Sequence, residues 1–254
     1  HDSFWFEYPT LVSESITKLD AWNIALGIIV SKLGELSIPS KIICAEPIPA
    51  GMAIFHKVYN RAPHVEITPL ISDSSEFDFL KNRNNDNLKR LSHRPALLFG
   101  GGKDSLANLG TLLEIGADVG LISYSFSYSG EIIINEKRRE QHSAIKYAEK
   151  HGIDVDIIRT NVVNTLRRPV HTELYTCSVM PILRQRGYGS IHFCYELCHY
   201  FIGRNDSPDL SPMFRRSRPE LNRLVSSHLQ ANLNINCNVS NLHLPISEFG
   251  AFLL

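Results

Sequence analysis

The chain has 254 residues, of which 43% are apolar and 20% are charged. These proportions are typical of a soluble globular protein. The longest apolar stretches, such as residues 25–30, are too short to span a membrane. The 26 basic and 26 acidic residues cancel, so no global field would draw the chain onto nucleic acid or an anionic membrane. We therefore expect any anion-binding site to be local.

The cysteines and the chain ends indicate the compartment. Five cysteines are an odd number, and they lack the density and short paired spacings of a disulfide scaffold. The start of the chain shows no signal-peptide pattern, so we expect a cytoplasmic protein.

The last six residues are mostly apolar, whereas chain ends usually lie at the surface. The natural protein could therefore continue beyond Leu254.

The first part of the chain predicts a small α+β region. Apolar residues recur at three- and four-residue steps from Leu19 to Leu33, which predicts a helix, while 41–44 and 64–67 are short and β-branched and predict strands. Residues 72–92 are rich in Ser, Asp, Asn, Lys and Arg.

We accordingly predict two domains. The first is a small N-terminal region with a polar linker, over residues 1–90, and it shows no motif of known chemistry. The second is a larger domain over residues 91–254.

After Pro95 strand-like runs alternate with helical patterns, which predicts βαβ units around a parallel sheet. Residues 96–99 form a short apolar run, as expected for a strand buried on both faces, and the apolar stripe from Leu106 to Leu113 predicts the helix that follows. Three more strands are expected at 119–126, 155–158 and 190–194, and two more helices at 135–150 and 179–185. The predicted fold is α/β, with a doubly wound parallel sheet.

The turn after the first of these strands holds six residues with phosphate-binding chemistry: Gly100, Gly101, Gly102, Lys103, Asp104 and Ser105. In doubly wound sheets this turn is the usual phosphate site. Glycines allow positive φ and let backbone N–H groups surround phosphate oxygens at the start of a helix. The lysine adds a charge, the serine a hydroxyl, and the aspartate can cap the helix or bind Mg²⁺.

Two better-known phosphate loops do not fit. A Walker A loop needs a glycine where Leu97 stands and Ser or Thr where Asp104 stands. The third glycine of the dinucleotide-binding fingerprint would fall on Ser105. A turn that merely allows tight strand-to-helix packing is the remaining alternative.

The six residues resemble the S-G-G-x-D-S loop of the PP-loop ATP pyrophosphatases, also called the N-type or adenine nucleotide α-hydrolase-like superfamily. The matching positions are Gly101, Gly102, Asp104 and Ser105, with Lys103 at the variable position and Gly100 in place of the usual first Ser. The resemblance covers about residues 95–200. Within the superfamily the glycine-started loop is similar to the branch of a peptidoglycan-precursor glutamate epimerase and, more distantly, to 7-cyano-7-deazaguanine synthase.

This resemblance implies a HUP-like fold, ATP and Mg²⁺ as cofactors, and an AMP-forming ligase or an ATP-dependent epimerase (isomerase). A substrate carboxylate or amide would be adenylated and pyrophosphate released; the closer branch implies an amino-acid carboxylate of a larger anionic metabolite. Family members bind adenine near the end of the second strand, which here holds Ser123, Tyr124 and Ser125. These residues would equally suit an ordinary strand.

Two alternative functions stay open. One is a tRNA- or nucleobase-modifying enzyme, which the neutral charge disfavours. The other is a catalytically inactive nucleotide-binding module, which the intact Lys103, Asp104 and Ser105 disfavour. As partners we expect a small, anionic substrate and neither a membrane nor nucleic acid, and the chain could form a homodimer.

Secondary candidates follow the third and fourth strands. Glu196 would lie near the carboxyl edge of the sheet, where it could bind Mg²⁺ or act as a base, or it could begin a surface helix. Arg168 could contact phosphate, and His171 could be a general base or phosphate contact, although a lone histidine is more often structural. Cys194, Cys198 and the adjoining histidine lack a second zinc-ligand pair. A basic group at 215–223 could bind pyrophosphate or an acidic substrate, and a solvated face is the favoured alternative.

Overall fold

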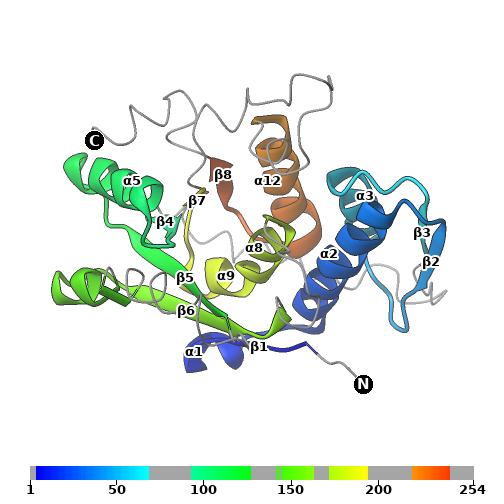
Figure 1. The fold of residues 1–254 in the computed structure, drawn as a ribbon, viewed down its shortest axis with the longest axis horizontal. Coiled ribbons are helices and arrows are strands. Elements are labelled where there is room, and N and C mark those ends of the chain that lie inside the picture. Colours follow the sequence, from blue (N-terminus) through cyan, green and yellow to red (C-terminus); the bar gives the residue numbers. More distant parts are fainter. Residues whose placement is uncertain are drawn as a thin grey trace.

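A computed structural model describes residues 4–68, 93–126, 142–143, 145–162, 172–193 and 219–240. Its main sheet has six strands in the order β1-β6-β5-β4-β7-β8 (Figure 1). Five of them run parallel: β4 (Pro95–Leu98), β5 (Gly120–Phe126), β6 (Val155–Thr160), β7 (Ser190–His192) and β8 (Asn238–Ser240). The short β1 (Phe6–Glu7) pairs antiparallel with β6 at one edge. The predicted α/β fold with a mostly parallel, doubly wound sheet is confirmed.

The strand order creates a switch point in the middle of the sheet. From β4 the chain passes to β5 and β6 on one side, and the later strands β7 and β8 lie on the other side. Connections that leave in opposite directions open a crevice at the carboxyl ends of the two central strands. Here those strands are β4 and β7.

Helices cover both faces of the sheet (Figure 1). On one face Leu97 and Leu121 pack with Leu109 and Leu112 of α5 (Lys103–Glu114). On the other face, Ile122, Ile158 and Ile191 join a larger core. That core includes buried residues of α8 (Thr172–Ser178), α9 (Met180–Arg186), α12 (Pro219–Leu233) and α2 (Lys18–Leu36).

The N-terminal residues contribute to this larger core. The long α2 begins with a capping box between Thr17 and Asp20, and it packs against α8, while α3 (Ala50–Tyr59) packs against α12. The four-residue α1 (Thr10–Ser13) precedes α2. A separate two-stranded parallel sheet consists of β2 (Ser40–Ile43) and β3 (Val65–Thr68). The helix and both strands expected in this part of the chain are therefore confirmed.

The predicted domain boundary near residue 90 and the polar segment 72–92 lie outside the described residues, so the division into two domains stays a prediction. Among the described helices, none combines the length and the hydropathy that crossing a membrane requires.

Candidate phosphate-binding site

The glycine loop lies where the sequence predicts it, between the end of β4 at Leu98 and the start of α5 at Lys103. This is the carboxyl end of a central strand, beside the switch point between β4 and β7. Gly102 is the N-cap residue of α5, with an extended backbone and no side-chain cap. The first N–H groups of a helix have no carbonyl partner within it, and the helix dipole favours negative charge at this end.

The conformation of the loop needs its glycines for two different reasons. Gly101 has a φ of +77°, a left-handed conformation that costs other residues energy. Gly100 and Gly102 are exposed, and a Cβ atom added to either would meet no atom within 4 Å. Open space therefore faces the backbone on both sides of Gly101, which leaves room for a group such as a phosphate.

Three polar side chains lie at the start of α5. The Ser105 hydroxyl donates to the carbonyl of Gly102 at 2.9 Å, and this serine is only 5% exposed. Lys103 Nζ donates to Asp104 Oδ1 at 2.7 Å, and the two side chains are 40% and 25% exposed. The loop thus combines a cation, a carboxylate and a hydroxyl within one turn of helix. A carboxylate oxygen is a ligand that Mg²⁺ prefers, so Asp104 fits the predicted metal role.

No cluster of three or more metal-binding side chains occurs among the described residues. The predicted second metal ligand, Glu196, lies outside them, as do Arg168, His171, Cys194 and Cys198. Their roles therefore stay predictions. Of the basic group at 215–223, the structure describes Arg223, which is exposed on α12.

The three candidates for adenine binding on β5 differ in their surroundings. Ser123 is fully buried, and Tyr124 is 5% exposed. The Tyr124 hydroxyl shares a hydrogen bond of 2.7 Å with the Ser178 hydroxyl of α8, and burial raises the tyrosine pKa well above its usual value. Tyr124 is thus a core residue, while Ser125 is exposed. The contribution of this strand to adenine binding stays a prediction.

His192 is a buried polar residue at the switch point that we did not single out from the sequence. It lies opposite Leu97 of β4 and opposite Ser240 of β8. Its Nδ1 shares a hydrogen bond with the Ser240 hydroxyl at 2.7 Å, and its Nε2 shares one with the Ser190 hydroxyl at 3.1 Å. Burial lowers the His192 pKa to about 4, so the ring is neutral at pH 7. The position of this histidine between the apolar Ile191 and Phe193 is the sequence feature that could have indicated a buried polar residue here.

Comparisons with known proteins give similarity of fold alone. No protein-family model matches this chain, and no curated protein matches it. The solved structure of a predicted subunit of tRNA methyltransferase from Methanocaldococcus jannaschii is similar over 63% of this chain and 72% of that chain, with 14% identity and a TM-score of 0.37.

A second solved structure, the U34-tRNA thiolase NcsA from Methanococcus maripaludis with its 4Fe-4S cluster, is similar over 55% of this chain. The match covers 59% of the thiolase, with 15% identity and a TM-score of 0.31.

Proposed function

We propose that this chain binds Mg-ATP at the glycine loop and transfers the AMP moiety to a carboxylate or amide oxygen of a small anionic molecule. The observation that carries the proposal is the open glycine turn at the carboxyl end of β4, beside the switch point and leading into α5. The resemblance of residues 100–105 to the PP-loop supports cleavage between the α- and β-phosphates. The acceptor oxygen would bond to the α-phosphorus as pyrophosphate leaves.

The residues of the loop have distinct roles in this proposal. Backbone N–H groups around Gly100 to Gly102 bind phosphate oxygens, and the Lys103 ammonium balances the charge that develops on pyrophosphate. Ser105 positions the phosphates through its hydroxyl, and Asp104 holds Mg²⁺. Most of the catalytic effect then comes from positioning and electrostatics.

The acceptor is a separate question. The similar structures are a predicted subunit of a tRNA methyltransferase and a tRNA thiolase, but similarity of fold at this level does not select an acceptor. A test should therefore include tRNA and nucleobases as well as amino acids and larger carboxylates.

The test of the reaction uses ATP labelled at the α-phosphate, incubated with the protein and this acceptor panel. We expect labelled AMP or an AMP adduct together with pyrophosphate, and a loss of about a hundredfold or more in Lys103→Ala and Ser105→Ala. ADP with inorganic phosphate as the products would contradict the proposal. Tight ATP binding without turnover on every acceptor would replace it by the inactive module.

The test of the site compares two glycines that both have a positive φ. Gly101 and Gly116 lie on either side of α5, with φ values of +77° and +73°. Alanine at either position carries a similar conformational cost of roughly 1–2 kcal/mol. We expect Gly101→Ala and Gly116→Ala both to lower the melting temperature, but only Gly101→Ala to abolish ATP binding in calorimetry. Equal ATP affinities in the two variants would move the nucleotide away from this loop.

A further inference from the structure

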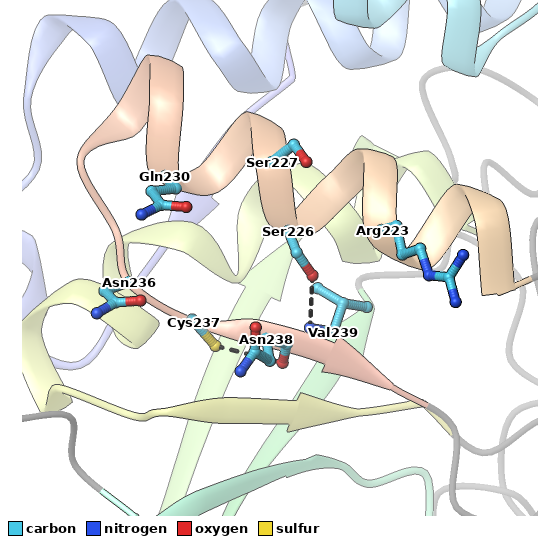
Figure 2. A pocket seen from close by; sticks show the side chains of 8 residues that line it. All are labelled: Arg223, Ser226, Ser227, Gln230, Asn236, Cys237, Asn238 and Val239. Carbon is cyan, nitrogen blue, oxygen red and sulfur yellow. Dashed lines mark hydrogen bonds between the residues drawn. The ribbon is translucent and has the colours of Figure 1, made fainter.

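A polar groove lies between α12 and β8, the last strand of the described part of the sheet (Figure 2). Its volume is about 510 Å³. It is lined by residues of α12 and by residues in or just before β8: Arg223, Ser226, Ser227, Gln230, Asn236, Cys237, Asn238 and Val239. This set contains one cation and no acidic side chain.

Two of the lining residues have structural roles. The Ser226 hydroxyl donates to the Asn222 carbonyl at 3.0 Å and accepts the Val239 N–H at 2.9 Å, so it joins α12 to the edge strand. Cys237 is 3% exposed, and burial raises the pKa of its thiol to about 12. A neutral, buried thiol is a poor nucleophile, so this groove is suited to binding rather than to covalent chemistry.

The other polar side chains of the groove are available to bind a ligand. Arg223, Ser227, Gln230, Asn236 and Asn238 are exposed, and none of these side chains forms a hydrogen bond or ion pair with a residue that the structure describes. They supply one guanidinium, one hydroxyl and three amides. An arginine fork suits a carboxylate, and amides can both donate and accept hydrogen bonds. The matching ligand is hydrophilic and has a single negative charge.

The edge of β8 disfavours a peptide as the occupant. Strand addition needs the outward N–H and C=O groups of the edge, but the Val239 N–H already donates to Ser226. The strand is also only three residues long. By contrast, the volume of the groove, about 510 Å³, is within the usual range for small-molecule sites.

We propose that this groove binds a small hydrophilic carboxylate, with its carboxylate on Arg223 and its hydroxyl or amide groups on Gln230, Asn236 and Asn238. Because α12 runs opposite to β8, Arg223 lies toward the carboxyl end of the strand (Figure 2). That end belongs to the same sheet edge as the glycine loop. A single arginine balances a carboxylate better than a doubly charged phosphate. This binding does not depend on the proposed adenylation.

The test measures binding by calorimetry in the absence of nucleotide. The probes are D-gluconate and N-acetyl-L-glutamine, and their uncharged counterparts are sorbitol and N-acetyl-L-glutamine amide. We expect at least one carboxylate to bind, and its affinity to fall about tenfold or more in Arg223→Gln and in the double variant Gln230→Ala with Asn236→Ala. Because these positions are exposed, the substitutions should leave the melting temperature unchanged.

Arg61→Gln is the matched control, because Arg61 is exposed just after α3 and does not line the groove, and this variant should bind the probe normally. The proposal is overturned if neither carboxylate binds, if the uncharged counterparts bind equally well, or if Arg223→Gln keeps full affinity. Tighter binding of inorganic phosphate than of both carboxylates would overturn the ligand class.

Discussion

His56 and His228 donate hydrogen bonds from their Nε2 atoms to one acceptor, Oδ1 of Asn23, at 3.0 and 2.9 Å. The rings belong to α3 and α12 and the amide to α2, so one oxygen joins three helices. Asn232 Nδ2 donates to His228 Nδ1 at 2.9 Å, which fixes the neutral form with its proton on Nε2. Burial lowers the pKa of both histidines, that of His228 to about 3.

This network predicts a loss of stability in acid. An unfolded histidine titrates near pH 6.5, well above the folded His228, so the unfolded chain binds a proton that the folded chain rejects. The stability is present in full above about pH 6.5 and is lost as the pH falls toward the folded pKa. At about pH 5 His228 alone should lower the free energy of unfolding by roughly 2 kcal/mol. Urea unfolding across this pH range measures the loss.

The control for this prediction is another histidine. His228→Gln removes one titrating ring and should reduce the pH dependence by the share of His228, while the buried His56 and His192 still contribute. His151→Gln changes an exposed histidine and should keep the wild-type slope. Identical slopes in the two variants would mean that the buried ring does not cause the effect.

A close contact between Gly120 and Tyr188 predicts a steric requirement at the start of β5. A Cβ atom on Gly120 would overlap the hydroxyl of Tyr188, a residue that is 1% exposed. Overpacking a core typically costs about 1–3 kcal/mol, and we expect Gly120→Ala to lie at the upper end. Gly110→Ala is the control, because a Cβ there meets no atom within 4 Å and should stabilise α5 by about 0.5–1 kcal/mol. Chemical denaturation of both variants measures these changes in the free energy of unfolding.

Two ion pairs made by residues of β6 are predicted to contribute very different amounts to the stability of the fold. Arg186 binds both carboxylate oxygens of Asp156, at 2.9 and 2.6 Å, and Asp156 is 1% exposed. Arg186→Met would leave that charge buried without a partner, which typically costs about 3–5 kcal/mol. Arg159 pairs with Glu7 at the surface, so Arg159→Met should cost less than about 1 kcal/mol. Similar losses in urea unfolding would contradict the assigned difference in burial.

Sequence periodicity predicts the centre of this fold better than its edges. The strands β4, β5 and β6 are apolar runs between strong turn signals, and their positions agree with the prediction to within a few residues. The edge strand β1 has two residues and β8 has three, which is too short for a periodic signal. Their positions depend on pairing with distant strands.

The functional features also differ in how well local sequence predicts them. Residues 100–105 are contiguous, so local sequence predicts both their turn and the helix that follows. The Asn23 network joins residues far apart in the chain, and the groove at Arg223 forms where α12 packs beside β8. Nothing local distinguishes these residues from ordinary surface or core positions. Asn23 Oδ1, for example, accepts its two hydrogen bonds only when α2, α3 and α12 pack together.

The departure of Gly100 from the serine of the resembling loop predicts a gain of function. A Cβ at Gly100 meets no atom within 4 Å, and its φ lies outside the left-handed region, so serine can be accommodated. A hydroxyl donating to a phosphate oxygen is a hydrogen bond to a charged group, worth about 1.5–3 kcal/mol. We expect Gly100→Ser to bind ATP about tenfold more tightly in calorimetry.

Gly100→Ala separates the hydroxyl from the backbone effect. Both substitutions restrict the unfolded chain, so both should raise stability by a similar amount of about 0.4–1 kcal/mol. Only serine supplies a donor, so only Gly100→Ser should gain ATP affinity. If alanine improves binding as much as serine does, loop rigidity and not a new phosphate contact is the cause. If both weaken binding, the open space above Gly100 is itself part of the phosphate site.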